Sequence, residues 1–176
     1  MNERAEADIR AAGMGFQKLN LLDGLLGEPA RDAPGEGCYA AISLLEVIEH
    51  LPVPPYLVLQ KLRAHLRPGG VLLMTTPNGY RLRNILYMLA NRRILDHFRH
   101  PGPDENMGHM HEYTLPQMLW QARRAGLEVV FAEHYEDGWA GSTPLRRAAK
   151  ALMRALVLAP HLRNGLVLGL RRPMAD

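Results

Sequence analysis

The residues best suited to chemistry are two carboxylates and a histidine that lie close together, Glu46, Glu49 and His50. Their spacing is i, i+3, i+4, so a helical turn would place all three on one face. They follow a short apolar run, residues 39–44, which predicts a strand buried on both faces. Ligands bind at the carboxyl ends of strands in open α/β sheets. The position of these residues therefore indicates a ligand site.

Two interpretations of this cluster stay open. Two carboxylates and an imidazole that converge in a cleft could bind a divalent cation, with His109 from a later loop as the fourth ligand. Alternatively, Glu46 and Glu49 cap and solvate the turn while His50 hydrogen-bonds locally. A zinc-protease site is not indicated, because His-Glu-x-x-His is absent and the inverted motif would need a histidine where Glu46 stands.

A β-α-β unit is predicted to position the cluster. After the first strand, leucines at near-helical spacing predict a helix that ends at the breaker Pro68-Gly69-Gly70. Residues 71–75 form a second apolar run with β-branched character, which predicts the next strand. Two strands joined by a helix pair in parallel, so their carboxyl ends share one edge of the sheet.

The rest of the chain continues the alternation of helices and strands. Helices are predicted over residues 2–13, 81–95, 114–126 and 142–157, and strands over residues 16–22, 127–132 and 166–170. Residues 28–37 and 96–111 are predicted loops, the first rich in Pro and Gly and the second rich in His. This order predicts a single α/β domain that spans residues 1–176.

Size and composition exclude several classes of protein. The chain has 176 residues, 47% of them hydrophobic, and a net charge of +3, so it is expected to fold with a real core. A single cysteine, Cys38, excludes an internal disulfide and fits a reducing compartment. The charged start is unlike a signal peptide, and no run approaches the length of a membrane span. A cytoplasmic location is therefore expected.

Four segments in order resemble class I S-adenosylmethionine-dependent methyltransferases. Glu46-Val47-Ile48-Glu49-His50 resembles the family's E-V-[IL]-E-H turn, and Leu66-Arg67-Pro68-Gly69-Gly70 its L-[KR]-P-G-G segment. Thr76-Pro77-Asn78 resembles the T-P-N that ends the next strand. Residues 109–114 followed by Ala125-Gly126-Leu127 resemble the family's H-x-x-x-[YF]-[ST] … aGF segment. The resemblance covers about residues 16–172.

The resemblance implies a Rossmann-like sheet with helices on both faces and the strand order 3-2-1-4-5-7-6. The last strand, residues 166–172, would be antiparallel and belong to the hairpin at the edge of the sheet. Two departures matter: no Gly-rich cofactor loop follows a strand upstream, and Ala40 stands where the family usually has Asp. The chain is thus expected to be N-terminally truncated, with its first β-α-β missing. An exposed strand edge would need rearrangement, a partner or a dimer to cover it, or a true start that lies upstream.

The resemblance also implies roles for single residues. Asp23 would approach the adenine of S-adenosylmethionine, although it could equally be an ordinary turn residue before Gly24. Leu44, Leu45 and Glu46 would run beside the methionine moiety of the cofactor. Glu49, His50 and His109 are the expected catalytic residues. Small-RNA 2′-O-methyltransferases and ubiquinone-type O-methyltransferases place a metal on a similar E-x-x-E-H and a distal His, which here implies the ligands Glu46, Glu49, His50 and His109.

The expected function is methyl transfer from S-adenosylmethionine to a hydroxyl of a small molecule or a lipid- or sugar-linked metabolite. A catalytically dead remnant that serves as a binding or scaffold module is the alternative. His111 and Tyr113 could face the acceptor, and residues 80–108 and 136–164 would form its lid. Arginines in both segments could contact an anionic acceptor or a membrane surface, or simply solvate the helices. Stacking aromatics among basic residues are not evident, so nucleic acid is not favoured.

Overall fold

The computed structural model describes residues 3–13, 21–22, 35, 37–95, 108–136 and 159–174. The chain divides into two compact units, residues 1–34 and 35–176. The described part of the first unit is helix α1, Glu3–Ala11, which confirms the predicted N-terminal helix. The predicted strand over residues 16–22 and the predicted helix over residues 142–157 lie largely or wholly outside the described residues. A single domain over the whole chain stays a prediction.

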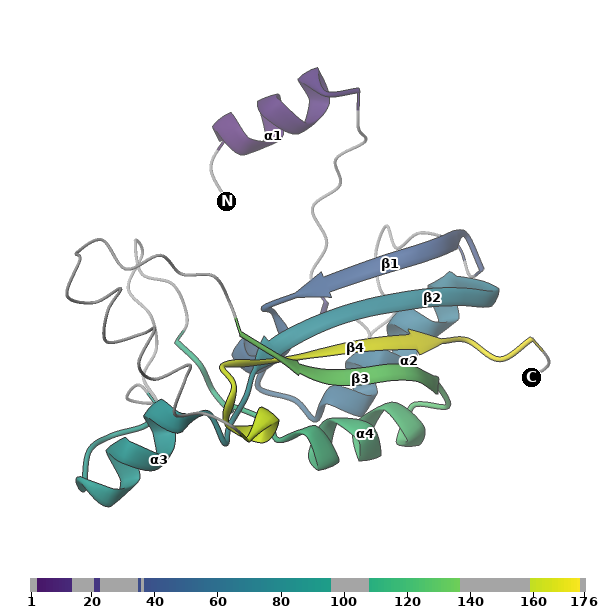
Figure 1. Cartoon of the computed structure of the whole chain (residues 1–176). Coiled ribbons are helices and arrows are strands. Elements are labelled where there is room, and N and C mark those ends of the chain that lie inside the picture. Colours follow the sequence, from purple (N-terminus) through teal and green to yellow (C-terminus); the bar gives the residue numbers. More distant parts are fainter. Residues whose placement is uncertain are drawn as a thin grey trace. The chain divides into compact units, whose positions relative to one another are not determined.

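Four strands form the sheet of the second unit: β1 Tyr39–Leu45, β2 Leu66–Pro77, β3 Glu128–Tyr135 and β4 Gly165–Arg171. Their order is β1-β2-β4-β3, as Figure 1 shows. β1 and β2 are parallel, and β4 is antiparallel to both β2 and β3. This order corresponds to the 4-5-7-6 portion of the expected sheet. The last strand is antiparallel and lies between β2 and β3, with β3 at the edge of the sheet, as the expected order implies.

Helix α2, Pro55–His65, connects β1 and β2 and completes the predicted β-α-β unit. The Pro68-Gly69-Gly70 segment was predicted as a breaker between helix and strand, and it instead lies inside β2. It kinks the strand: Gly69 has φ 74°, and the register with β1 shifts between Tyr39 and Ala41. A side chain at Gly70 would meet the carbonyl oxygen of Arg67 at 2.8 Å, so this close approach of backbone requires glycine.

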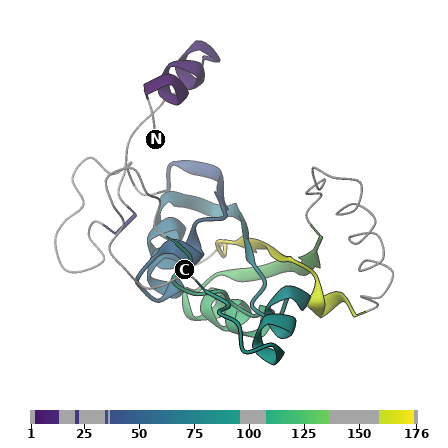
Figure 2. The same ribbon diagram turned by 90° about the vertical axis from the view of Figure 1, so that its left-hand side faces the viewer.

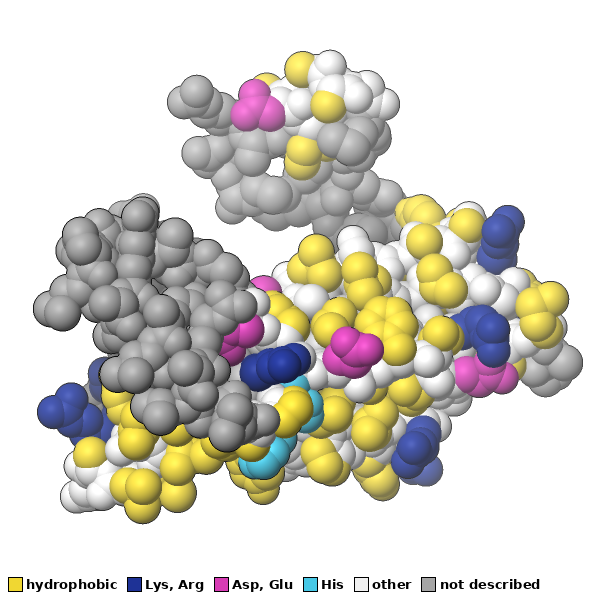
Figure 3. Space-filling view, in the orientation of Figure 1, with side chains coloured by type: hydrophobic (Ala, Val, Ile, Leu, Met, Phe, Trp, Pro, Cys, Tyr) yellow, Lys and Arg dark blue, Asp and Glu magenta, His cyan; other side chains and the backbone are white. Residues whose placement is uncertain are grey.

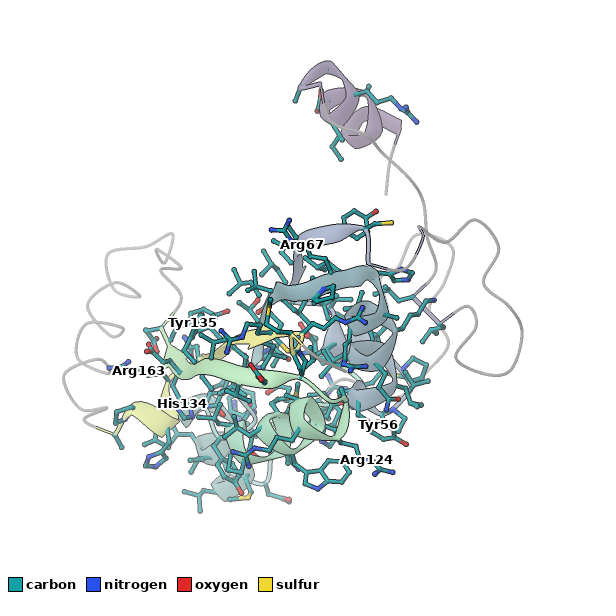
Figure 4. The ribbon with its side chains drawn as sticks, turned by 90° about the vertical axis from the view of Figure 1, so that its right-hand side faces the viewer. Tyr56, Arg67, Arg124, His134, Tyr135 and Arg163 are labelled. Carbon is teal, nitrogen blue, oxygen red and sulfur yellow. The ribbon has the colours of Figure 1, made fainter. Side chains whose placement is uncertain are left out.

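Helix α4, Leu115–Arg124, begins directly after Thr114, the first residue of the helix predicted over residues 114–126. The Thr114 hydroxyl accepts from the backbone N–H of Gln117, whose side chain in turn accepts from the backbone N–H of Thr114. This capping box satisfies two helix N–H groups that would otherwise lack partners. α4 packs beside α2, where Arg124 lies 5.7 Å from the ring centre of Tyr56 (Figure 4).

Both α2 and α4 cover the same face of the sheet (Figures 1 and 2). Buried side chains of β2 and β4 face them and form the core, including Leu72, Met74, Leu168 and Leu170. Among the described residues of the second unit no helix lies on the opposite face, and residues 142–157, where a further helix was predicted, lie outside the described part. The predicted helical cover is thus confirmed on the face of α2 and α4. Leu45, Val71, Leu73 and Phe131 are 41–51% exposed on the uncovered face, where Figure 3 shows apolar side chains. We call these four residues the open apolar face.

The exposure of β1 contradicts the prediction of a strand buried on both faces. Tyr39 is 41% exposed and Leu44 alone in the strand is fully buried. The apolar run is real, but β1 lies at the end of the sheet and turns one side toward the open apolar face. A short apolar run occurs both in strands buried on two sides and in strands with one exposed side, so the sequence does not separate the two cases.

Three short helices complete the second unit. η1 spans Ile48–His50, α3 spans Leu82–Leu89 and η2 spans Pro160–Leu162. α3 confirms the helix predicted over residues 81–95 but ends earlier, at Leu89. Among the described residues, no helix is long and apolar enough to cross a bilayer.

Candidate functional site

The carboxyl ends of β1 and β2 lie side by side and build the site. The backbone N–H of Glu46 donates to the carbonyl of Thr75 at 3.1 Å, which continues the parallel ladder past the end of β1. Glu46 then takes a left-handed backbone conformation with φ 52°, which turns the chain into η1. A non-glycine residue in this region is uncommon and costs free energy, so the sharp turn is a specific feature of this edge.

Glu49 lies at the centre of the site and is fully buried. The Thr76 hydroxyl donates to its Oε2 at 3.1 Å, whereas Oε1 has no hydrogen-bond partner within the described part of the chain. Burial raises the pKa of the Glu49 carboxyl above its ordinary value, and the negative charge of Glu46 adds to the effect. The site therefore contains a carboxyl group that is predisposed to hold a proton or to meet a cation.

The backbone of Glu49 also holds the later loop in place. Its carbonyl accepts hydrogen bonds from Met110 N–H at 2.7 Å and from His111 N–H at 3.2 Å. These two bonds bring residues 108–111 against η1, although the two segments are far apart in the sequence. These backbone contacts place His109 in the cluster, which explains how a histidine distant in the sequence lies beside the E-V-I-E-H turn.

Two histidines complete the cluster. Nδ1 of His50 lies 3.2 Å from the carbonyl oxygen of Gly108, and Nδ1 of His109 lies 3.1 Å from Oε1 of Glu112. Because both partners are acceptors, each Nδ1 is the donor, and Nε2 becomes the nitrogen that would bind a ligand or a proton. The two rings meet edge to face at 4.8 Å. Glu49, His50 and His109 each offer a ligand atom within 4.8 Å of the others.

One of the four predicted ligands, Glu46, lies outside this cluster. Its carboxylate accepts a hydrogen bond from the Tyr135 hydroxyl at 3.1 Å, across the sheet edge from the end of β3. The condition for one shared helical face is not met, because η1 begins only at Ile48 and Glu46 itself has a left-handed backbone conformation. The structure thus brings together three of the four predicted ligands.

The residues predicted to bind the cofactor differ in accessibility. Leu44 is 5% exposed and packs in the core, so only its backbone remains near the edge. Leu45 is 51% exposed on the uncovered face of the sheet, and Glu46 is exposed at its end. Asp23 lies outside the described residues. The cofactor contacts of all four residues stay predictions.

Glu112 is the buried polar centre that sequence reasoning missed. Its carboxylate pairs with Arg81 and His109 and accepts from Asn84 Nδ2 at 2.6 Å. A cavity of about 140 Å³ lies beside it, lined by Arg81, Arg83, Ile94, Leu95, His109 and Glu112. His109 is three residues before Glu112 in the same motif, but the other two partners, Arg81 and Asn84, come from the N-cap and the first turn of α3, and no sequence spacing links them to the motif.

Asn78 explains the Thr-Pro-Asn motif in structural terms. Its fully buried side chain donates to the carbonyls of His161 at 2.7 Å and Arg163 at 2.8 Å, and accepts from the N–H of Tyr80 at 3.0 Å. It therefore joins the end of β2 to η2 and to the start of α3. Nearby, Arg163 donates to the carbonyl of His134 at 3.1 Å, beside Tyr135 (Figure 4).

Two residues predicted to face the acceptor lie next to the cluster. Tyr113 is buried, and burial together with the negative charge of Glu49 raises the pKa of its hydroxyl. His111 is exposed and its ring lies 4.5 Å from that of Tyr113. The tyrosine thus belongs to the wall of the site, and the exposed histidine is the more accessible of the two.

Comparisons with known proteins agree with this architecture. Residues 10–131 match the model of a methyltransferase domain family, so the chain belongs to that family. Curated protein sequences gave no match. The fold resembles that of a S-adenosylmethionine-dependent methyltransferase from Mesorhizobium loti, with a TM-score of 0.58 and 16% identity over 97% of this chain and 77% of that one. The fold is therefore that of class I methyltransferases.

Two further structures share the fold. One is 1,6-didemethyltoxoflavin-N1-methyltransferase from Burkholderia thailandensis, solved with its substrate and S-adenosylhomocysteine, at a TM-score of 0.57 and 14% identity. The other is the [4+2]-cyclase SpnF, at 0.56 and 16%. The matches cover 98% and 97% of this chain, but only 58% and 62% of those chains. The present chain thus spans less than two thirds of either relative.

Proposed function

We propose that this chain carries out methyl transfer from S-adenosylmethionine to a hydroxyl group of a small molecule or a lipid- or sugar-linked metabolite. The observation that supports this function is the convergence of Glu49, His50 and His109 at the carboxyl edge of a methyltransferase-family sheet. Ligand sites of open α/β sheets lie at that edge. Positioning of donor and acceptor supplies much of the catalysis in such a transfer.

The described residues fit one end of S-adenosylmethionine. The cofactor supplies a methyl group on a positively charged sulfonium, and the edge carries the carboxylates of Glu46 and Glu49. Glu46 is exposed where β1 ends, and its left-handed backbone conformation turns the chain sharply there. Leu45 and Glu46, with the backbone of Leu44, would hold the methionine end, and Asp23 would contact the adenine. The negative charges of these carboxylates would attract the positive charge of a bound sulfonium.

The histidines would activate the acceptor. Nδ1 of His50 and of His109 donates to Gly108 and Glu112, so Nε2 of either ring can accept the acceptor's hydroxyl proton. Glu112 orients His109 as a carboxylate orients a catalytic imidazole. In this form of the proposal His50 or His109 is the general base, and Glu49 lies directly beside them.

The same residues also fit a divalent cation, which would lower the pKa of a bound acceptor hydroxyl. The observation is the buried Oε1 of Glu49, which has no hydrogen-bond partner in the described part of the chain and lies 3.8 Å from Nε2 of His50. Nδ1 donation to a carbonyl or carboxylate is also typical of metal-binding histidines. In this second form the ligands are Glu49, His50 and His109. Glu46 has the least support among the predicted ligands, because it lies outside the cluster.

Calorimetric titration of S-adenosylmethionine against the 176-residue chain tests the activity. We expect saturable binding, weakened by Glu46→Ala, with Glu128→Ala as a control because Glu128 pairs with Arg171 on the surface. Absence of binding at millimolar cofactor would sink the claim that this chain alone is an enzyme.

Metal analysis of the purified protein separates the two forms of the proposal. Bound Mg²⁺, Mn²⁺ or Zn²⁺ should fall strongly in Glu49→Ala and stay near the wild-type level in Glu46→Ala, because only Glu49 belongs to the compact cluster. Equal metal content in wild type and Glu49→Ala would refute the metal form and leave the histidine-base form.

A second function, a binding or scaffold module without methyl transfer, is compatible with one observation. The fold is shared with a [4+2]-cyclase, so this fold does not by itself define methyl transfer. The two functions differ in the calorimetric experiment: a module without catalysis would bind no S-adenosylmethionine, yet would keep its folded structure.

A further inference from the structure

Helix α3 has the reverse of the usual arrangement of polar and apolar side chains. Its one buried residue is Asn84, which is 2% exposed, whereas Leu86 is 47% and Leu89 is 75% exposed. Residues in an α-helix follow one another at about 100°, so Leu86 lies about 160° around the axis from Asn84. A surface helix normally turns its apolar stripe toward the core. α3 instead presents that stripe outward.

Polar anchors explain why the helix is held in this orientation. Asn84 Nδ2 donates to Oε2 of Glu112 at 2.6 Å and to the carbonyl of Gly79 at 3.1 Å. Arg81, at the start of the helix, pairs with the other oxygen of the same carboxylate. Glu112 is itself buried. Satisfied buried polar groups fix geometry tightly, so the outward direction of the apolar stripe is specified.

The apolar stripe is accompanied by positive charge. Residues 79–95 contain four arginines, namely Arg81, Arg83, Arg92 and Arg93, and no acidic residue. Arg92 and Arg93 are exposed just beyond the helix, and Arg83 lies 5.5 Å from the ring centre of Tyr87. Two further large side chains are exposed nearby: Met88 is 60% exposed and Tyr80 is 58% exposed. In Figure 3 apolar side chains cover the lower left, where Figure 1 places α3.

We propose that α3 docks on an anionic lipid bilayer, with Leu86 and Leu89 in the interfacial region and Arg92 and Arg93 against the headgroups. An amphipathic helix with a basic flank is the form in which peripheral proteins lie on such surfaces. A contiguous apolar surface beside basic residues marks an interaction site. The net positive charge of the segment selects an anionic surface over a neutral one.

The class of acceptor that this docking implies rests on the proposed function. The carboxylate of Glu112 binds both the base of α3 and His109 of the cluster. A bilayer under α3 would therefore lie close to the candidate site. The acceptor class that fits is a lipid-linked hydroxyl compound, delivered from the membrane to the edge where Glu49, His50 and His109 meet.

Co-sedimentation with vesicles tests the docking without cofactor or acceptor. The full chain is mixed with vesicles of phosphatidylcholine alone, or of phosphatidylcholine with phosphatidylglycerol. We expect binding to the anionic vesicles only, reduced at least ~10-fold by Arg92→Gln/Arg93→Gln and by Leu86→Ser/Leu89→Ser. Val130→Ser is the matched control, because Val130 is 56% exposed on β3 and should leave the binding unchanged.

Three outcomes would overturn the proposal. In the first, the wild type does not bind anionic vesicles. In the second, both double variants bind anionic vesicles as well as the wild type does. In the third, Leu86→Ser/Leu89→Ser changes the oligomeric state or lowers the melting temperature with no change in vesicle binding, which would assign the stripe to a second copy or to another segment of the chain. Since no cofactor is present, a failure of S-adenosylmethionine binding would leave this result intact.

Discussion

At the scale of single residues, the site depends on side chains that share partners across long sequence distances. The E-V-I-E-H motif predicted that Glu49 and His50 would follow the first strand, and the structure places them in η1, just beyond the carboxyl end of β1. It could not predict that Thr76 would donate to one oxygen of Glu49 and leave the other without a partner. Nor could it predict the loss of Glu46 from the cluster, because that follows from one left-handed backbone angle.

Glu49→Gln should change the pH dependence of stability in chelator-treated protein. The pKa of Glu49 is raised in the folded state, so its contribution to stability is full below the ordinary glutamate pKa and is lost as pH rises through the folded value. The glutamine variant has no such loss. We expect its stability above neutral pH to exceed that of the wild type by about 1–3 kcal/mol, the usual penalty of an unsatisfied buried group.

Urea unfolding at acidic and alkaline pH measures this difference. At acidic pH, where Glu49 is protonated, the two proteins should be of similar stability. A wild type that gained stability relative to Glu49→Gln as pH increased would show that the folded site favours the ionised carboxylate in spite of its burial, against the expectation.

At the scale of elements, most of the sequence prediction succeeded where local chemistry decides. The β-α-β unit, the helix that follows Thr114 and the existence of the final strand all follow from short-range patterns, whereas the antiparallel direction of that strand was implied by the resemblance. The prediction failed where long-range context decides. Pro68-Gly69-Gly70 lies within β2 and contacts the residue that follows β4: Gly69 N–H donates to the carbonyl of Arg172 at 3.0 Å.

Helix α3 is attached by an ion pair and hydrogen bonds, so Glu112→Ala should loosen it. Removing one partner of a buried pair leaves the other charge uncompensated, at a cost of about 3–5 kcal/mol. Arg81 is the partner left behind, with its side chain 14% exposed. Glu128→Ala is the matched control: its pair with Arg171 is half exposed on both sides, and such surface pairs contribute about 0–1 kcal/mol.

Chemical denaturation of the two variants gives the comparison. The denaturation midpoint should fall much further in Glu112→Ala than in Glu128→Ala. Equal midpoints would mean that the Glu112 cluster adds nothing to the fold and that α3 is held by other contacts.

At the scale of the whole molecule, the described helices of the second unit cover one face of its sheet. The sequence predicted the strand order from the resemblance, and the observed β1-β2-β4-β3 order agrees with it. Apolar alternation in β2 could not reveal that one of its two sides would remain uncovered. Buried Leu72 and exposed Leu73 are chemically the same residue, and only the positions of α2 and α4 separate them.

The open apolar face should drive self-association, as the expected partner or dimer at the incomplete sheet suggests. Leu73→Lys places a charge at the centre of that face, where Leu73 is 41% exposed. We expect the wild type to show concentration-dependent association in light scattering and the variant to shift toward monomer. A wild type that stays monomeric at every accessible concentration would contradict this expectation.

Among the described residues β1 pairs only with β2, and this has a measurable kinetic consequence. In a parallel pair, alternate amides of an end strand point toward the neighbour and the others point away. Deuterium uptake along residues 39–45 should therefore alternate between slow and fast positions. An extended segment that added to this edge would slow the fast set and leave the slow set unchanged. The strand can thus report, amide by amide, whether its free side has found a partner.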